Sequence, residues 1–349
     1  MARLRPVSNV RMVDVAKAAG CSRAAVTHVL TGAGEGQIRV SDEKARLIRK
    51  VAKQLNFHPN HAAQQLMGKQ SMALGLISTN WREPLHLRAF YWLQVLAAAR
   101  GYQLLTAQCA TLEETQRTVR QFRSRGIDGA MAFAEGREFH APAVRECLGQ
   151  LPLLVSLFGR SCVPGATSLE VDEADGIRQA VEHLHAQGRR KIVLLLEEKS
   201  LSSTRRHNGF TRAHRDLGLK VRPEQIFIGT KTWLWSLPDL YEQVDAQIER
   251  LVIQHHVDAV IASNDYVAAF ILQGLARRGL SVPRDVAVVG CENDLVSHHT
   301  NPALTTIHFP VHEVAEAAVG MLAAAAERGN LELLQSRAFK PTLLTRGTT

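Results

Sequence analysis

Residues 12–30, Met-Val-Asp-Val-Ala-Lys-Ala-Ala-Gly-Cys-Ser-Arg-Ala-Ala-Val-Thr-His-Val-Leu, have the pattern of two short helices joined by a sharp turn. The apolar residues of the first helix recur at helical spacing: Val13, Ala16 and Ala19. Gly20 follows them as a C-terminal stop, and Ser22 is placed to cap the second helix. The side chains that the second helix would bury are Ala25, Val26 and Leu30.

This is a helix-turn-helix pattern, in which the second helix enters the major groove of DNA. The side chains that would point at base edges are Arg23, Ala24, Thr27 and His28. A small helical hairpin without any DNA contact would have the same pattern, and on these residues alone it is the better account. The charge distribution and the rest of the chain reverse that order.

Positive charge is concentrated near the N-terminus of this 349-residue chain. Residues 1–70 hold 12 Lys and Arg against 4 Asp and Glu, a net charge of +8, whereas the whole chain carries +9. Such asymmetry is typical of a module that neutralises DNA phosphates. A membrane surface would also attract basic residues, but the segment has neither a long apolar run nor an amphipathic helix with aromatic anchors. We therefore expect double-stranded DNA as a partner and no membrane.

The five cysteines are scattered along the chain: Cys21, Cys109, Cys147, Cys162 and Cys291. Their odd number and wide spacing are unlike a disulfide framework, and the N-terminus lacks the apolar core of a secretory signal. We expect a cytoplasmic, reduced protein. The histidine doublets at 255–256 and 298–299 are adjacent rather than spaced along one helix face, so we predict no metal site and no cofactor.

A third helix is predicted after the glycine-rich residues 31–40. Ser41 would cap it, and it would run to about Leu55. Its apolar stripe can cover the first two helices: Ala45, Ile48, Val51, Ala52 and Leu55. Pro59 disfavours helical geometry at the residue before it and so ends this region. Residues 60–71 are helix formers, but the segment is too short to be stable as an isolated helix.

Three stretches of this region resemble the lactose repressor/galactose repressor (LacI/GalR) family: Val-Asp-Val-Ala-Lys-Ala-Ala-Gly-Cys-Ser, Asn-Phe-His-Pro-Asn and Ala-Gln-Gln-Leu-Met-Gly-Lys-Gln-Ser. The resemblance implies that residues 60–71 form a hinge helix that orders on the operator, pairs with its dimer mate in the minor groove and wedges Leu66 between base steps. An apolar wedge of this kind unstacks bases, and the bent duplex offsets the cost. Leu66 could instead be a linker residue that packs on the next domain. The DNA-binding residues implied are Ser22, Arg23, Ala24, Thr27, His28, Ser41, Asn60, Gln64, Leu66 and Met67.

From Ser71 onward, short apolar runs alternate with helical stretches, which is typical of parallel sheets covered by helices on both faces. The expected strands cover residues 73–78, 103–107, 129–133, 153–157, 191–196, 259–262, 286–290 and 339–344. The expected helices cover residues 86–100, 112–125, 173–187, 205–217, 239–255 and 265–278. The motifs Gly-Arg-Arg-Lys-Ile, Ser-Asn-Asp and Pro-Ala-Leu-Thr-Thr-Ile extend the resemblance through this region. They imply a core similar to periplasmic sugar-binding proteins.

The predicted fold class is α/β. An N-terminal three-helix helix-turn-helix DNA-binding head (residues 1–58) and a hinge helix or linker (59–71) precede a two-lobed, periplasmic-binding-protein-like core with parallel sheets (72–349). The core is expected to bind the effector and to dimerise. The lobes are expected to divide as follows: lobe one about 72–168 and 302–336, lobe two about 169–301 and 337–349.

Two-lobed folds of this kind bind small ligands between the lobes, with polar groups from loops at the carboxyl ends of the strands. The resemblance implies that Arg206, three residues before the Gly-Phe pair, anchors hydroxyls or a carboxylate of the effector. Trp235 matches an aromatic wall, with Trp233 as the alternative if an insertion shifts the alignment. Without the resemblance, Arg206 would be interpreted as a solvated helix arginine beside Arg205. The effector-binding residues implied are Thr79, Arg206, Trp233, Trp235, Asn264, Tyr266 and Glu292.

The chain also departs from the family pattern. Gly290-Cys291-Glu292-Asn293 stands where the family has Gly-Tyr/Phe-Asp-Asp, and Tyr266 replaces a smaller polar residue. Effector identity therefore cannot be carried over, and we favour a sugar or sugar derivative, with a purine second. The second helix departs at Arg23, Ala24 and His28, so the operator sequence cannot be carried over either.

Two function classes follow from the sequence. The first is a DNA-binding transcriptional regulator, a repressor, controlled by a small-molecule effector. It is expected to be a homodimer, because two-fold operators mirror two-fold proteins. The alternative is a solute-binding protein or enzyme of the same core fold with a basic N-terminal extension. We expect no enzyme, because the chain has no nucleophile elbow, Walker A loop or metal-spaced cluster.

Overall fold

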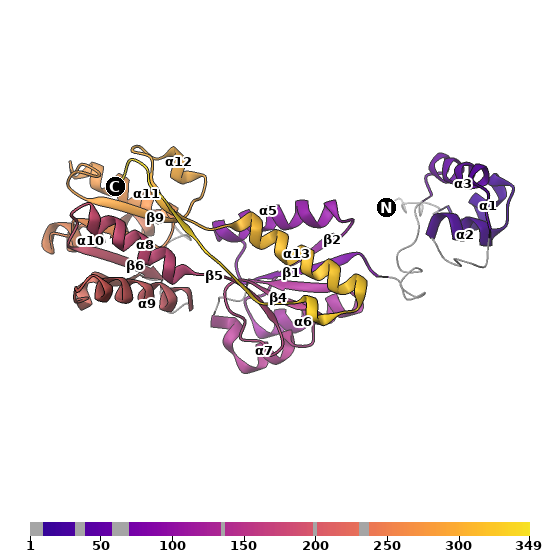
Figure 1. Ribbon diagram of the computed structural model, residues 1–349, viewed down its shortest axis with the longest axis horizontal. Helices are drawn as coiled ribbons and strands as arrows, with labels where there is room; N and C mark the ends of the chain where they lie inside the picture. Colours follow the sequence, from indigo (N-terminus) through magenta and orange to yellow (C-terminus); the bar gives the residue numbers. More distant parts are fainter. Residues whose placement is uncertain (1–9, 32–38, 58–69, 134–136, 198–200, 230–236) are drawn as a thin grey trace, which may run out of the picture. The chain divides into compact units, whose positions relative to one another are not determined.

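The computed structural model describes residues 10–31, 39–57, 70–133, 137–197, 201–229 and 237–349 (Figure 1). Contacts divide the chain into two compact units, Met1–Ser71 and Met72–Thr349, and each is described by itself. Six of the predicted site residues lie outside the described residues: Asn60, Gln64, Leu66, Met67, Trp233 and Trp235. Among the described helices, none combines the length and the apolar character needed to cross a membrane.

The described part of the first unit holds three helices, α1 (Met12–Ala19), α2 (Arg23–Thr31) and α3 (Asp42–Gln54). Helix α1 ends at Gly20, whose φ of 58° lies in the left-handed region that glycine adopts without strain. The Ser22 hydroxyl oxygen accepts a hydrogen bond from the Ala25 N–H (3.1 Å), and the Ser41 hydroxyl oxygen accepts one from the Lys44 N–H (3.3 Å). Both serines cap helices, as the sequence predicted.

One face of each helix forms the core of this unit: Val15, Ala16, Ala19, Val26, Ile48, Val51 and Ala52. Val13, which was expected in the core, is 46% exposed. Val15 takes the buried position instead, because it shares a helix face with the two core alanines of α1. Leu55 was also expected in the core but is 36% exposed, since α3 ends one residue before it.

The first lobe of the second unit contains a parallel sheet with the strand order β11-β5-β4-β3-β1-β2. Its strands are β1 (Ala73–Ser78), β2 (Gln103–Gln108), β3 (Gly129–Ala132), β4 (Leu154–Phe158), β5 (Thr167–Val171) and β11 (Arg337–Phe339). Helices α5 (Pro84–Ala99) and α13 (Val311–Arg328) pack together on one face. Helices α6 (Leu112–Ser124) and α7 (Pro142–Leu148) cover the other, and short 3-10 turns lie at Arg137–His140 and Leu331–Leu333.

The second lobe has a sheet with the order β12-β10-β9-β8-β6-β7, in which β12 is antiparallel to β10 and the other pairs are parallel. Its strands are β6 (Ile192–Glu197), β7 (Ile226–Gly229), β8 (Ala259–Ile261), β9 (Ala287–Glu292), β10 (Thr305–His308) and β12 (Thr342–Leu344). Its helices are α8 (Glu173–Ala186), α9 (Leu201–Asp216), α10 (Leu237–Ile248), α11 (Asp265–Arg277) and α12 (Val296–His299). A 3-10 turn (Pro223–Gln225) precedes β7, and a π-helical turn (Glu249–Gln254) continues α10.

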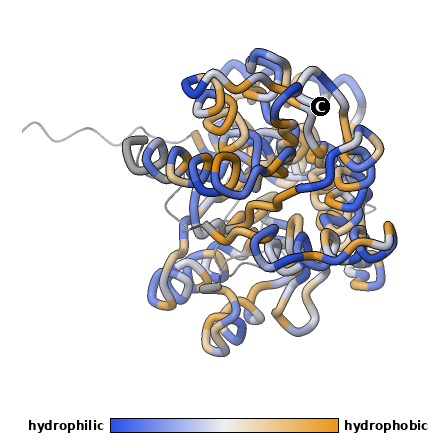
Figure 2. The backbone as a smooth tube through the Cα atoms, turned by 90° about the vertical axis from the view of Figure 1, so that its left-hand side faces the viewer, coloured by the Kyte–Doolittle hydropathy of each residue, from blue (hydrophilic) through white to orange (hydrophobic). Residues whose placement is uncertain are grey.

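The strands alternate their side chains between the two helix layers. On β1, Leu74 and Leu76 face the α5/α13 layer, whereas Ile77 packs with Phe122 of α6 on the opposite side. Gly75 also faces α6, and a Cβ there would lie 2.5 Å from the Phe122 ring. Coloured by hydropathy, the strands in the middle of the core are mainly orange, whereas the helices around them alternate between blue and orange (Figure 2).

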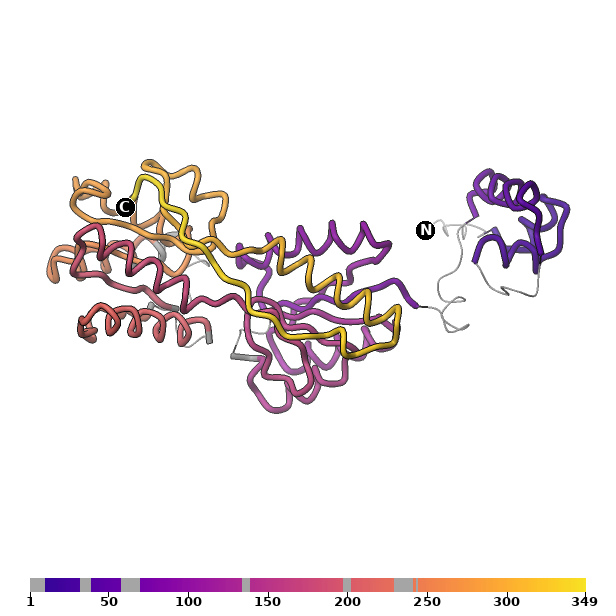
Figure 3. Tube along the Cα trace, viewed as in Figure 1, coloured from indigo at the N-terminus to yellow at the C-terminus, as the bar shows by residue number. Residues whose placement is uncertain are grey.

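The chain crosses between the lobes at three places in the described residues: after β5, after β10 and between β11 and β12 (Figure 3). We expected residues 302–336 in lobe one, but β10 pairs with β9 in the second sheet, so the return to lobe one comes after His308. We also expected one strand at 339–344. Its two ends belong to different sheets, because Pro341 between them has no N–H with which to continue a ladder.

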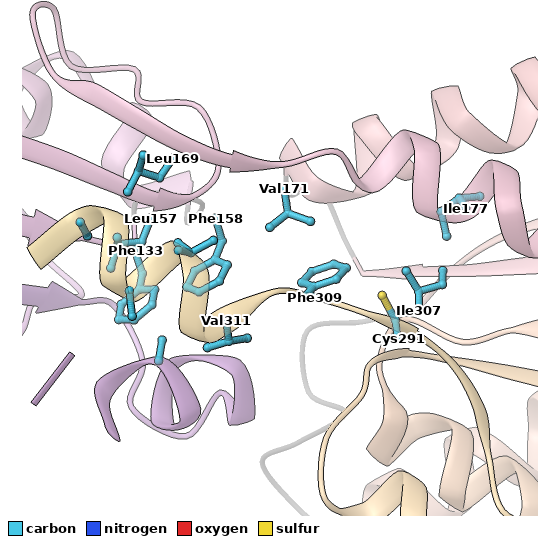
Figure 4. Close-up of a cluster of buried hydrophobic side chains, with 14 of the residues drawn as sticks. Phe133, Leu157, Phe158, Leu169, Val171, Ile177, Cys291, Ile307, Phe309 and Val311 are labelled. Carbon is cyan, nitrogen blue, oxygen red and sulfur yellow. The ribbon is translucent and has the colours of Figure 1, made fainter. Parts of the chain in front are cut away.

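A continuous hydrophobic cluster extends from lobe one into lobe two along these crossings (Figure 4). Phe133 and Phe158 lie at its lobe-one end, and Cys291 and Ile307 lie in lobe two. Phe309, on the crossing from β10 to α13, lies between them. The buried crossings therefore hold the two sheets to one common core.

Candidate DNA-binding and effector sites

The first turn of α2 presents two of the predicted base-contacting residues to solvent. Arg23 and Ala24 are exposed, whereas Thr27 and His28 are partly buried. The Thr27 hydroxyl donates to the Arg23 carbonyl (2.9 Å), which holds that side chain against its own helix. The exposed cations of α3 are Arg46, Arg49, Lys50 and Lys53. An exposed arginine at the start of the second helix suits base contact, and a basic third helix suits phosphate contact.

Arg206 lies on α9 in the second lobe and is only 9% exposed. Its Nε donates to the carboxylate of Glu173 at the start of α8, and its Nη1 donates to the Ser263 carbonyl (2.5 Å). Gly209, almost one turn further along α9, allows the two helices to approach, because a Cβ there would lie 2.4 Å from the Ala174 carbonyl oxygen. The alternative of a solvated helix arginine is therefore wrong for Arg206.

Glu173 is the internal partner of the α9 cations. One carboxylate oxygen accepts from Arg205, and the other accepts from Arg206 and from the Ser202 hydroxyl. Burial alone would raise the pKa of this carboxyl, but the two guanidinium groups hold it below its usual value. Glu173 thus stays ionised and balances the charge of Arg206. No motif in the sequence pointed to it, since it lies 33 residues from Arg206.

Asn264 is 4% exposed and forms the N-cap of α11, where its Oδ1 accepts from the Val267 N–H (2.9 Å). The neighbouring Ser263 carbonyl accepts from Arg206. The start of α11 and the first turns of α9 are thereby joined. The side-chain oxygen of Asn264 has a structural partner, and its amide lies next to the backbone that holds Arg206.

Tyr266 follows in the first turn of α11 and is partly buried. Its hydroxyl donates to Asp294 (3.3 Å). Asp265, beside it, is fully buried and accepts from the Thr306 hydroxyl (2.6 Å) and from the Asp294 N–H (2.5 Å). Burial raises the pKa of Asp265 from its ordinary 3.8 to about 7. These contacts fasten α11 to the loop after β9, where the next predicted residue lies.

Glu292 ends β9 and is 9% exposed. Its φ is 95° and that of Asn293 is 55°, a backbone conformation that costs free energy in residues with a side chain and that is concentrated at functional sites. Burial raises the pKa of the Glu292 carboxyl well above its usual value. Its carbonyl accepts from Nη2 of Arg88 (2.9 Å), a residue of lobe one.

Arg88 joins the two lobes and was not among the predicted site residues. It lies on α5, and besides the Glu292 carbonyl it meets the carboxylate of Asp294 at 3.5 Å. A sequence signal for it is lacking, because an arginine in the first turns of a helix is more often solvated. The closeness to Glu292 arises only when the lobes meet, 204 residues apart along the chain.

The lobe-one side of this junction is aromatic. Thr79, the residue predicted here, is partly buried after β1. The rings of His86 and Phe133 are stacked at 3.9 Å between centroids, and Phe133 lies parallel to Phe158 at 6.0 Å. Trp81 meets Phe133 edge-on at 6.2 Å. Sequence analysis missed this group, which comes from the ends of three strands and the start of α5.

His86 is held by two oxygens, because its Nδ1 lies 3.0 Å from both the Ser78 hydroxyl and the Asn80 carbonyl. Burial lowers the pKa of the imidazole to about 4, so the ring is neutral at pH 7. Phe158 adopts a φ of 63°, the left-handed region, at the carboxyl end of β4. Strain at both Phe158 and Glu292 therefore marks the strand ends where ligands of parallel-sheet proteins bind.

The groups named as imagined acid–base residues do not assemble with this site. Asp172 accepts from the Asp175 N–H (3.1 Å) as the cap of α8, and His207 is exposed. The polar groups of lobe two are instead hydrogen-bonded to one another around Arg206 and Asp265. This arrangement suits recognition of a ligand by fixed donors and acceptors.

Two protein-family models match the chain. The model described as "Bacterial regulatory proteins, lacI family" matches residues 11–60, which include α1, α2 and α3. The model described as "Periplasmic binding protein-like domain" matches residues 181–349. Together they place a regulatory DNA-binding module before a ligand-binding type of core.

Curated relatives agree along the whole length. The HTH-type transcriptional regulator DegA of Bacillus subtilis is 26% identical over 343 residues, 96% of this chain and 97% of the relative. The HTH-type transcriptional repressor PurR of Aliivibrio fischeri is 25% identical over 313 residues, 88% of this chain and 89% of the relative. Both names are those of transcriptional regulators rather than enzymes.

Solved structures show the same fold. A Lac repressor dimer bound to operator and the anti-inducer ONPF superposes with a TM-score of 0.82 at 23% identity, covering 98% of this chain and 99% of that one. A transcriptional regulator CelR–cellobiose complex gives 0.68 at 22% identity, covering 98% and 100%. With the helix-turn-helix model, the binding-protein model and full-length regulator relatives in agreement, the chain belongs to the LacI family of bacterial regulatory proteins.

Proposed function

We propose that this chain is a sequence-specific DNA-binding repressor whose operator affinity is controlled by a small effector bound between the two lobes of the core. The observation that carries the proposal is the junction in which Arg88 of lobe one meets Glu292 and Asp294 of lobe two. A ligand that binds both lobes would change this junction. In a chain that begins with a LacI-type helix-turn-helix, such a change can be transmitted to DNA affinity.

In this proposal, the DNA contacts of the head divide into two kinds. Arg23 reads base edges, because an arginine fork matches a guanine edge, and Ala24, Thr27 and His28 complete the reading surface. Ser22 and Ser41 cap their helices and place backbone N–H groups toward phosphates. The proposed hinge contacts are Asn60, Gln64, Leu66 and Met67.

The effector is proposed to bind at the carboxyl ends of the strands of both lobes. Supporting observations are the burial of the polar groups in lobe two and the stacked rings of lobe one. The proposed contacts are Thr79, Arg206, Trp233, Trp235, Asn264, Tyr266 and Glu292. A sugar or sugar derivative is favoured and a purine is second. The names of the CelR–cellobiose complex and of PurR are compatible with either class.

A homodimer is part of the proposal. Leu87, Tyr91 and Val95 are 50%, 59% and 42% exposed on α5, and their four-residue spacing puts them on one helix face. A second copy packed on this apolar face would bring two heads to a two-fold operator. Light scattering should give two chains per particle. A monomer at micromolar concentration that binds DNA with one chain per site contradicts the dimer.

The regulator is tested by selecting binding sites from a pool of random duplex DNA with the full chain. We expect a two-fold symmetric consensus and an affinity that falls steeply with salt. Arg23→Ala should relax one position of each half-site, whereas Arg212→Ala, which removes an arginine whose side chain is 72% exposed on α9, should leave the consensus unchanged. Equal affinity for every sequence in the pool would favour the alternative, a solute-binding protein or enzyme with a basic extension.

A further inference from the structure

The strongest cation of the proposed effector site already has a counter-ion within the protein. Arg206 donates to Glu173, and the same carboxylate accepts from Arg205 and Ser202. All three donors come from the first turns of α9, so Glu173 is enclosed by that helix. An anionic ligand would have to compete with Glu173 for Arg206, and it would leave one of the two carboxylates unpaired.

The rest of the junction is richer in acids than in bases. Glu292, Asp265 and Asp294 are each no more than 9% exposed, and Arg88 is the cation that meets them in the described residues. The raised pKa values of Asp265 and Glu292 agree with a site in which negative charge is already in excess. A further negative charge there would lack a free partner.

The surfaces that complete the site are uncharged rings. His86, Phe133 and Phe158 form the stack on the lobe-one side. The Arg206 guanidinium lies 5.9 Å from the centroid of the Phe309 ring, so its planar face is also against an aromatic group. Aromatic faces pack well on the apolar faces of sugars and on flat bases.

We propose that the effector of this chain is an uncharged ring compound, a neutral sugar or a nucleobase, and that Glu173 sets this preference by neutralising Arg206. Sugar acids and phosphorylated sugars are excluded by the same contact. This inference rests on the proposed function, because it takes Arg206 to be part of the effector site.

The test removes the charge of Glu173 and asks whether the protein acquires an anion site. Thermal unfolding of the full chain is measured in sodium phosphate, in sodium gluconate and in sodium chloride of the same ionic strength. The native chain should unfold at the same temperature in all three. Glu173→Gln leaves Arg205 and Arg206 without a counter-ion, and phosphate should then raise its Tm by on the order of 3 °C or more over chloride.

Two controls isolate the contact. Adding Arg206→Gln to Glu173→Gln should reduce the phosphate gain. Glu182→Gln, which breaks the partly exposed pair between Glu182 and Arg178 (2.6 Å), should produce no gain. The proposal is overturned if either anion stabilises the native chain over chloride and Arg206→Gln removes that effect. It is also overturned if folded Glu173→Gln does not respond to anions.

A panel of matched pairs tests the ligand class on the native chain and separates its two sources: glucose with gluconate, ribose with ribose 5-phosphate, and adenine with adenosine monophosphate. The uncharged member of a responding pair should shift the Tm more, and the reverse order overturns the proposal. Site selection on random DNA is run in parallel. Loss of sequence-specific DNA binding counts against the proposed function, whereas an anion response of the native chain counts against this inference alone.

Discussion

Arg88 is the side chain that joins the two lobes, and replacing it with methionine gives a direct test of their coupling. Methionine keeps most of the length of the side chain and its packing on α5, but it removes both contacts with lobe two. These are the hydrogen bond to the Glu292 carbonyl (2.9 Å) and the ion pair with Asp294 (3.5 Å). The contacts made by α5 within lobe one remain.

The magnitude follows from the geometry. A hydrogen bond from a charged donor contributes roughly 1.5 to 3 kcal/mol, and a partly exposed ion pair adds at most about 1 kcal/mol. The Arg88 side chain is 25% exposed, so part of its interaction is replaced by water when the lobes separate. We therefore expect a loss of about 2 kcal/mol, which shifts the balance between joined and separated lobes by roughly 30-fold.

The assay compares Arg88→Met with Arg100→Met, a variant at the other end of α5. The Arg100 guanidinium is exposed and meets only the Leu96 carbonyl of its own helix, at 3.5 Å, among the printed hydrogen bonds. Arg88→Met should lower the Tm of the core by about 4 °C and change operator affinity by up to roughly 30-fold. Arg100→Met should change operator affinity by less than about twofold. Equal behaviour of the two variants would refute the role of Arg88 as the link between the lobes.

Further outcomes are expected at other positions. Gly209→Ala should destabilise the core by about 3 kcal/mol in thermal unfolding, because its Cβ would meet the Ala174 carbonyl at 2.4 Å, whereas Gly320→Ala, in open space on α13, should stabilise it slightly; equal effects contradict the close α8–α9 contact. Asp265, whose pKa is raised from 3.8 to about 7, binds a proton in the folded state that the unfolded chain releases, so the stability that this proton contributes is complete below pH 3.8 and is lost as the pH rises through about 7. The unfolding free energy of the native chain relative to Asp265→Asn should fall over that window, and a flat difference would show that Asp265 does not hold the proton. Leu66→Ala should weaken operator binding in gel-shift titrations while leaving effector affinity in the DNA-free protein unchanged, and a loss of effector affinity would show that Leu66 packs on the core instead.

Much of the local structure could be predicted because its causes act over a few residues. Gly20 ends α1 through its left-handed φ, and Ser22 and Ser41 cap the helices that follow them. Runs of buried aliphatic residues gave seven strands of the two sheets close to their observed bounds. The phase of α1 was wrong at Val13, because small alanines allow either of two faces to be taken as the core.

Strands at the margins of the sheets were harder to predict. β5 and β10 contain serine and threonine, whose burial depends on partners that come from elsewhere in the chain. Thr306, for example, is fully buried because its hydroxyl donates to Asp265. The amphipathic contrast used to recognise strands is weak in such segments, so tertiary hydrogen bonds decide their place.

The sequence by itself determined a basic helix-turn-helix head, an α/β core and the family to which the chain belongs, because caps, turns and periodicity depend on neighbours within a few positions. Only the tertiary structure decided the chemistry of the effector site. Arg206 meets Glu173 across 33 residues, and Arg88 meets the Glu292 carbonyl across 204. Such pairs form when the helices pack and the three crossings bring the lobes together. Burial then makes each charge depend on its partner, and a linear sequence does not specify which partner that is.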